Sequence, residues 1–209
     1  MSRSGNRTPR CLYISYEGAL EPLGQSQVVP YVVGLSARGR SMVLMTFEKR
    51  RWWAQEPLRA QTGRRLREAG VVWIPLGYHQ RPRVLSTVWD MAAGVVVGMA
   101  VIVRHRVRLV HVRSFVPAGI GYWLKRCLRV KLLFDMRGFW VEERVEAKLW
   151  PQDGWLYRLA KRCERAFLRE ADAVVTLTEA SRSEIGRLVP RESRRVPLGV
   201  IPKIGRAHV

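Results

Sequence analysis

Short apolar runs rich in Val, Ile and Leu recur along the chain, separated by longer polar or amphipathic stretches. The runs do not alternate between apolar and polar residues, which is typical of strands covered on both faces in a parallel sheet. They predict strands at residues 11–16, 41–47, 71–76, 109–114, 130–135 and 173–178. The hydrophobic pattern therefore predicts a buried, mostly parallel sheet.

The stretches between the apolar runs predict helices. Gly39 and Gly70 suit the ends of the first two helices, because glycine readily adopts the left-handed conformation that closes a helix. The expected helices cover residues 27–39, 56–70, 84–103, 118–128, 154–172 and 180–188. This alternation predicts an α/β fold with a doubly wound, Rossmann-like sheet and right-handed crossovers. We expect one domain over residues 11–202, after a polar tail at residues 1–10.

Residues 84–103 are apolar enough to raise the question of a membrane span. Their uninterrupted apolar part begins only after Asp90 and is shorter than the ~20 residues that a span needs. The segment also falls where the alternation of strands and helices requires a crossover. We expect a buried or half-buried crossover helix, and some contact with a membrane is the alternative.

The charge of the chain is strongly positive, with 37 Lys and Arg against 17 Asp and Glu and a formal net charge of +20. One interpretation is an anionic partner, such as nucleic acid, a phosphate-bearing substrate or an acidic membrane surface. The other is coding bias, because most of the positive residues are Arg and they form no single dense block. Both interpretations stay open at this point.

The three cysteines favour neither disulfides nor a zinc site. Cys11, Cys127 and Cys163 are odd in number and widely separated. We expect small buried or half-buried side chains in a reducing compartment. The polar, basic N-terminus has no apolar segment typical of a secretory signal. No metal-binding cluster appears, and neither a metal nor another cofactor is expected.

The last residues are expected to be foreign to the natural protein. Ile204 to Val209 is the translation of ATC GGA AGA GCA CAC GTC, the start of a widely used sequencing adapter. Residues 203–209 are therefore left out of functional reasoning. A natural stop codon directly after Val209 in the intact gene would contradict this hypothesis.

Ligands of open α/β sheets bind beyond the carboxyl ends of the strands, so polar residues there are the first candidates for a site. After the first strand come Gly24, Gln25 and Ser26, with Ser26 a candidate cap for the following helix. A helix that opens on glycine favours an anion, although an ordinary cap and turn explains the same residues. Neither a dinucleotide fingerprint nor a phosphate loop is present.

The ends of the fourth and sixth strands also carry polar residues. Arg113 and Ser114 precede a helix that bears two glycines, whereas His111 lies inside its strand and is expected to be a core histidine. After the sixth strand, Glu179 stands at another helix start, where a cap is the default interpretation. Several strand ends with polar groups predict one convergent cleft.

The fifth strand ends in the densest group of candidates. Asp135 and Arg137 are candidates for positioning a substrate, although an ion pair that only orders the loop is the alternative. The other substrate-binding candidates of this stretch are Gly138 as a turn, Trp140 as a stacking surface and Glu143 as a hydrogen-bond acceptor. Because Arg137 would lower the pKa of Asp135, a positioning role is favoured over that of a base.

Four runs of the sequence resemble those of a known protein family. The runs PLGQSQ (22–27), FDMRGFWVEER (134–144), ADAVVTLTEAS (171–181) and VPLGVIP (196–202) resemble the N-terminal, acceptor-side domain of GT-B fold glycosyltransferases of family 4. The resemblance implies half of a two-domain architecture whose other domain binds the nucleotide sugar. A chain without that domain is expected to be truncated and inactive alone.

For the intact protein, the resemblance implies a retaining transfer of a hexosyl-type sugar from a nucleotide sugar to a glycan or lipid-linked acceptor, without metal, in polysaccharide biosynthesis. A cytoplasmic protein with peripheral contact to the anionic inner face of the plasma membrane is expected. The alternative is a non-enzymatic basic module that binds nucleic acid or an anionic surface. Nucleic acid is disfavoured, because aromatic and basic residues are not interleaved.

Overall fold

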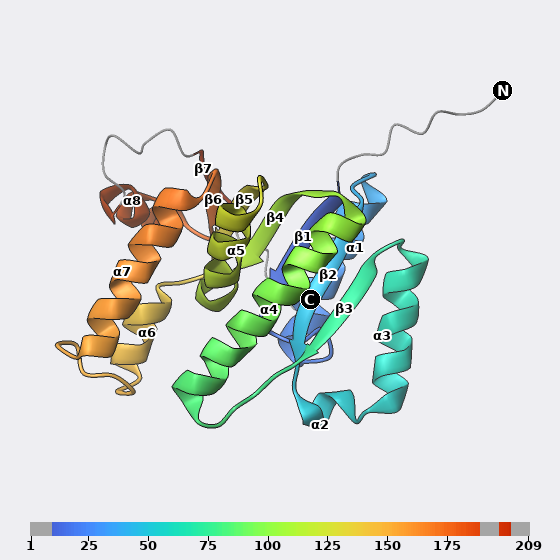
Figure 1. Cartoon of the computed structure of the whole chain (residues 1–209), viewed down its shortest axis with the longest axis horizontal. Coiled ribbons are helices and arrows are strands. Elements are labelled where there is room, and N and C mark those ends of the chain that lie inside the picture. Colours follow the sequence, from blue (N-terminus) through green and yellow to red (C-terminus); the bar gives the residue numbers. More distant parts are fainter. Residues whose placement is uncertain (1–9, 189–196, 202–209) are drawn as a thin grey trace, which may run out of the picture.

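The computed structural model describes residues 10–188 and 197–201, and within them one parallel seven-stranded sheet forms the centre of the molecule (Figure 1). Its strand order is β3-β2-β1-β4-β5-β6-β7. The strands are β1 (Arg10–Ser15), β2 (Met42–Glu48), β3 (Val72–Gly77), β4 (Val107–Arg113), β5 (Lys131–Met136), β6 (Ala173–Thr176) and β7 (Leu198–Val200). The order reverses between β1 and β4, as in doubly wound sheets, so the predicted fold class is confirmed.

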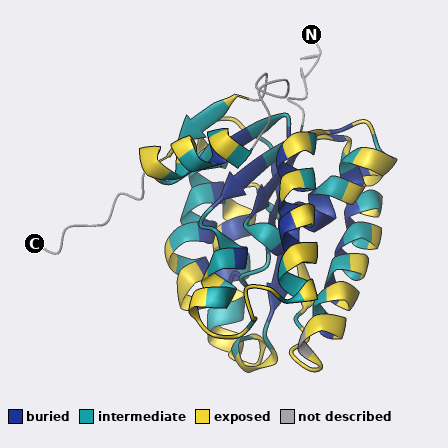
Figure 2. Cartoon of the chain, turned by 90° about the vertical axis from the view of Figure 1, so that its left-hand side faces the viewer, coloured by how far each residue is buried: buried dark blue, intermediate teal, exposed yellow. Residues whose placement is uncertain are grey.

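Helices cover both faces of the sheet. They are α1 (Val29–Ala37), which continues a π-helical turn η1 (Gly24–Val28), α2 (Arg50–Trp53), α3 (Glu56–Glu68), α4 (Arg83–His105), α5 (Phe115–Cys127), α6 (Trp140–Glu146), α7 (Trp155–Glu170) and α8 (Glu179–Leu188). Residues of α1 and α3 form one buried cluster with Tyr13, whereas α4, α5 and α7 share a larger one with Leu12 and Ile14. Successive strand residues thus serve opposite faces. Figure 2 shows the buried strands between helices with exposed outer surfaces.

The sequence pattern missed the shortest elements. Helix α2 has only four residues and β7 only three, too few for a period to show. Helix α6 was missed because the run after Asp135 was interpreted as a loop, although Trp140 opens a helix with Glu142 and Glu143 in its first turn. Acids in a first turn favour a helix through its dipole.

Helix α4 is the predicted crossover, joining β3 to β4 across one face of the sheet. It packs closely on α5 through small residues: an added Cβ on Gly94 would lie 2.6 Å from Ile120, and one on Gly98 would lie 2.8 Å from Leu124. By length and composition alone α4 could cross a membrane, and 33% of its most apolar window is buried inside the protein. It is therefore a half-buried helix.

One expectation about the cysteines was wrong. Cys127 is exposed at the end of α5, whereas Cys11 and Cys163 are half-buried. Burial raises the pKa of the Cys11 thiol to about 12. The polar tail before Arg10 and the adapter-like residues 203–209 lie outside the described residues, so those two expectations stay predictions.

The contrast between two glycines of the first helical segment gives a test of the fold. A Cβ on Gly24 would lie 1.9 Å from the carbonyl oxygen of Gly18, whereas nothing lies within 4 Å of one on Gly34. We expect Gly24→Ala to lower the free energy of unfolding by about 1–3 kcal/mol, the usual cost of overpacking a core. Gly34→Ala should raise it by about 0.5–1 kcal/mol.

Urea unfolding of both variants beside the parent chain measures this difference. Equal effects of the two substitutions would contradict the close approach of η1 to the loop that follows β1.

Candidate functional site

A pocket of about 230 Å³ opens at the carboxyl ends of the central strands, beside the point where the strand order reverses. Its walls come from segments that follow β1, β4, β5 and β6. The lining residues are Tyr16, Glu17, Leu23, Arg113, Ser114, Val116, Pro117, Arg137, Gly138, Trp140, Glu143 and Leu177. The ends of these four strands do meet at one pocket, but of the predicted polar residues only those of the β4 and β5 segments line it.

Arg113 is the most unusual residue of the pocket. It is the last residue of β4, and only 2% of its surface is exposed. Its Nη2 donates a hydrogen bond of 2.7 Å to Gln27, and Glu17 lies 3.4 Å from its Nε. Neither Nε nor Nη1 has a hydrogen-bond partner. A buried charged group left with open donors is costly unless a ligand completes its contacts.

The N-terminus of α5 lies against the same pocket. Ser114 precedes the helix with φ 68° and ψ −177°, a backbone conformation that normally needs glycine. Its side chain makes no capping bond, and the first turn holds Phe115, Val116 and Pro117. The free N–H groups of a first turn carry partial positive charge. Together with Arg113 they make this wall of the pocket favourable to an anion.

Asp135 and Arg137 form the predicted ion pair. The carboxylate is buried in β5, and both Nε and Nη2 of Arg137 approach its Oδ2, at 2.8 and 2.7 Å. Nε2 of His111 lies 3.8 Å from the same oxygen, too far for a hydrogen bond. Burial acts to raise the pKa of Asp135, but His111 and Arg137 outweigh it and hold the pKa below its usual value. This favours a charged, positioning carboxylate.

His111 is buried in the core, as expected, and packs edge-on against Tyr13 with ring centroids 4.6 Å apart. Its Nε2 has no hydrogen-bond partner. It is therefore a core histidine, as expected, but its hydrogen bonding is incomplete. The unbonded Nε2 is the atom that lies nearest to Asp135.

The other residues of the fifth-strand stretch have roles that the sequence did not specify. Gly138 has no positive φ, and a Cβ added to it would lie 2.3 Å from Oε1 of Glu143, an exposed side chain that can move away. The ring of Trp140 stacks on Phe115 at 4.6 Å, and the guanidinium of Arg144 lies 4.5 Å from its centroid. The stacking surface of Trp140 is thus used within the chain. Glu143 is exposed at the rim.

Helix α6 is held in place by a buried charge cluster on α7. The ammonium of Lys161 donates to Glu142 at 2.6 Å and also to Glu164, whose side chain is almost fully buried. Burial raises the pKa of Glu164 despite its contact with Lys161. Burial also acts to lower the pKa of Lys161, but the two carboxylates hold it above its usual value. This cluster fixes the segment that carries Trp140.

Gly24, Gln25 and Ser26 do not open a helix as expected. The helix begins near Pro22, and these residues form the π-helical turn within it. The amide of Gln25 donates to the carbonyl of Ala19 and to Thr62, and the hydroxyl of Ser26 donates to the carbonyl of Pro22. Ser26 is therefore not a cap, and that expectation was wrong.

The backbone N–H groups that follow β1 are already filled by carboxylates of the chain itself. Gly18 donates to Glu21 at 3.0 Å, and Ala19 and Leu20 donate to the buried Glu48 at 2.7 and 3.3 Å. Burial raises the pKa of Glu48, although these bonds oppose the shift. The N–H groups of the loop between β1 and η1 are therefore bound within the chain and are not free for a ligand anion.

Glu179 lies outside the pocket lining, exposed at the start of α8, where it pairs with Arg182 at 3.3 Å. Tyr16 and Glu17 were missed as site residues in the sequence, although Tyr16 ends the first apolar run and Glu17 directly follows it. Within the described ranges no group of three or more His, Cys, Asp or Glu residues could hold a metal ion.

Several solved structures, glycosyltransferases among them, resemble this fold. Sucrose-phosphate synthase from Thermosynechococcus elongatus superposes with a TM-score of 0.64 and 18% identity, covering 94% of this chain and 48% of that one. UGT2 of Phytolacca americana, complexed with UDP-2fluoro-glucose and pterostilbene, superposes with a TM-score of 0.62 and 12% identity, covering 96% of this chain and 55% of that one. HepE of Anabaena, in complex with UDP and glucose, superposes with a TM-score of 0.53 and 12% identity, covering 91% of this chain and 43% of that one. The chain therefore spans about half the length of these structures.

The fold and the position of the pocket define a domain of the GT-B glycosyltransferase type. Residues 25–200 match the Glycosyl transferase 4-like domain, so the chain belongs to that family. The resemblance seen in the sequence is thereby confirmed. A comparison with curated proteins gives no significant match.

The lowered pKa of Asp135 makes a prediction about stability and pH. Its carboxylate is stabilised in the folded state relative to the usual pKa of 3.8, so its contribution is present above that pH and lost as the pH falls through the folded-state pKa. We expect Asp135→Asn to be less stable than the parent at pH 7, with the difference shrinking toward pH 3.

Urea unfolding at a series of pH values measures this difference. Asp153→Asn, at an exposed position, is the control for losing a carboxylate. A difference between parent and Asp135→Asn that stays constant over the whole series would contradict the account of the ion pair.

Proposed function

We propose that this domain serves a nucleotide-sugar-dependent glycosyltransferase that transfers a hexosyl-type sugar to a glycan or lipid-linked acceptor with retention of anomeric configuration. The observation that carries the proposal is the buried guanidinium of Arg113, which lines the pocket beside the N-terminus of α5 and has two nitrogens without a hydrogen-bond partner. Relatives of the same fold bind UDP with glucose or UDP-2fluoro-glucose, which supports a nucleotide sugar as donor.

The chemistry of such a transfer suits this pocket. As the bond to the sugar breaks, negative charge grows on the leaving diphosphate, and donors fixed in advance stabilise it without a metal. Arg113 and the first turn of α5 offer such donors. Glu17 and Glu143 also line the pocket and can accept hydrogen bonds from sugar hydroxyls.

Asp135 has a positioning role in this proposal. Its depressed pKa makes it a weak base, and both of the Arg137 nitrogens that contact it meet a single carboxylate oxygen. The pair keeps the guanidinium of Arg137 at the pocket wall. We propose that Arg137 in turn orients the acceptor or the leaving group.

The setting that we propose is the cytoplasm, where nucleotide sugars would be the donors, with the protein at the inner face of the plasma membrane and a role in polysaccharide biosynthesis. The second domain of the intact protein would hold the nucleotide, and the chain alone would be inactive. The alternative of a basic module that binds nucleic acid has no support from a specific contact surface in the described residues.

Release of nucleoside diphosphate by the intact gene product, with UDP-glucose and a membrane lipid extract as acceptor, tests the proposal. We expect Arg113→Gln to lower turnover by about 10²–10³-fold, the effect of removing one preorganised donor to a developing anion. Asp135→Asn and Arg137→Ala should lower it as well. Arg64→Gln, with the same charge change at an exposed position of α3, is the matched control.

The proposal fails if Arg113→Gln turns over like the control while circular dichroism shows both folded. It also fails if the intact protein transfers sugar from none of a panel of nucleotide sugars.

A further inference from the structure

The outer face of α4 is apolar along nearly the whole helix. Every exposed residue from Val84 to Val103 is apolar: Val84, Leu85, Val88, Trp89, Ala92, Val96, Ala100 and Val103. They recur at the spacing that places residues on one side of a helix. A surface helix normally turns its polar face to water, so the solvent side of α4 is the reverse of the usual pattern.

The exposure of these side chains is large. Leu85 is 68% exposed, Trp89 65% and Val103 71%, and on α5 the indole of Trp123 is 54% exposed. The two helices pack directly on each other through Gly94 and Gly98 of α4. We call the exposed faces of α4 and α5 together the α4–α5 surface. Trp is typical of the boundary between lipid and water, because its ring is apolar and its N–H is polar.

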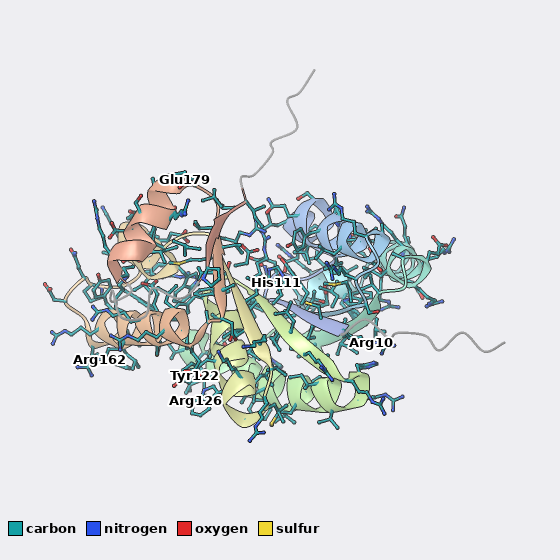
Figure 3. All side chains as sticks on the ribbon, turned by 90° about the horizontal axis from the view of Figure 1, so that it is seen from above. Arg10, His111, Tyr122, Arg126, Arg162 and Glu179 are labelled. Carbon is teal, nitrogen blue, oxygen red and sulfur yellow. The ribbon has the colours of Figure 1, made fainter. Side chains whose placement is uncertain are left out.

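Positive charge surrounds the α4–α5 surface without interrupting it. Arg104 and Arg106 are exposed at the C-terminal end of α4, and Arg126 is exposed next to Trp123. Helix α7 adds an exposed row of Arg158, Arg162, Arg165 and Arg169. Figure 3 shows Arg126 and Arg162 on the side of the molecule that carries α4, α5 and α7. An apolar strip bordered by arginines matches the acyl boundary and the headgroups of an anionic bilayer.

We propose that the α4–α5 surface docks on an anionic lipid membrane, with α4 lying flat in the headgroup region. A spanning arrangement does not suit this helix, because its inner side packs on the sheet and on α5 and holds the buried carboxylate of Asp90. A helix of 23 residues is ~35 Å long, so the strip offers an extended line of contact.

The docking surface meets the pocket at one end of α4. Asp90, in the second turn of the helix, accepts a hydrogen bond of 2.8 Å from Tyr16, which lines the pocket. Figure 1 shows α4 beginning at the lower edge of the sheet, where the strands end. A docked molecule would thus hold its pocket beside the headgroups. The inference rests on the proposed function only in so far as the acceptor is carried by a lipid.

Two other occupants of the surface fit the observations less well. A second copy of the chain would bring together two apolar strips, but also two rows of like charge on chains of net charge +20. Nucleic acid would meet the arginines, but it contacts proteins mainly through phosphates and stacked bases and would leave the aliphatic strip unused.

Cosedimentation of the chain with vesicles of equal parts phosphatidylglycerol and phosphatidylcholine tests the inference directly. We expect binding to these vesicles and at least tenfold weaker binding to pure phosphatidylcholine. The double variant Leu85→Ser/Trp89→Ser should bind the anionic vesicles at least tenfold more weakly than the parent. The matched control Trp53→Ser/Ile201→Ser removes one indole and one aliphatic side chain from exposed positions outside the α4–α5 surface, and it should bind like the parent.

A second pair of variants tests the charge. Arg104→Ser/Arg162→Ser should weaken binding several-fold more than Arg64→Ser/Arg67→Ser, which removes the same charge from exposed positions of α3. Circular dichroism verifies that all variants are folded.

Three results would overturn the inference. The first is that Leu85→Ser/Trp89→Ser binds vesicles as well as the parent does, or loses binding only as much as its control Trp53→Ser/Ile201→Ser. The second is a dimer, seen by analytical ultracentrifugation, that Leu85→Ser/Trp89→Ser dissociates while vesicle binding is absent. The third is binding of an oligonucleotide, but not of vesicles, through these residues. Because vesicle binding needs no sugar donor, failure here is separate from failure of sugar transfer.

Discussion

A buried guanidinium with open donors is the constraint on which the site depends. Arg113 ends a central strand, is almost fully enclosed, and shares only part of its hydrogen-bonding capacity with Gln27 and Glu17. The cost of holding an arginine in this way is offset when an anionic or hydroxyl-bearing ligand completes its contacts. The pocket and the N-terminus of α5 lie beside this group, at the place where the strand order reverses.

The surroundings of Arg113 keep that ligand site rigid. The ion pair of Asp135 and Arg137 secures one wall, and the contact of Lys161 with Glu142 and Glu164 holds the helix that carries Trp140. On the opposite side, Glu48 fills the N–H groups that follow β1, so that turn is ordered without a ligand. The guanidiniums of Arg113 and Arg137 thereby supply the positive charge of the pocket wall, and the surrounding charged groups fix the segments that carry them.

The sequence predicted the sheet, most of its helices and the edge that holds the site, because buried parallel strands leave short apolar runs that are visible in the order of residues. It also predicted the pairing of Asp135 with Arg137, which are only two residues apart. It did not predict that Gln25 and Ser26 would bond within their own helix, or that Trp140 would stack on Phe115, because those contacts depend on where distant backbone segments meet. The exposed side of α4 was equally hidden, since an apolar helix has the same sequence whichever side it buries.

The central claim is that Arg113 completes its hydrogen bonds with a ligand of the transfer reaction. The most direct measurement is a crystal structure of the intact protein with a nucleotide sugar and an acceptor bound. The account predicts a ligand oxygen within hydrogen-bonding distance of the guanidinium of Arg113. A bound complex in which the guanidinium of Arg113 contacts only protein atoms or water, with every ligand atom elsewhere, would contradict it.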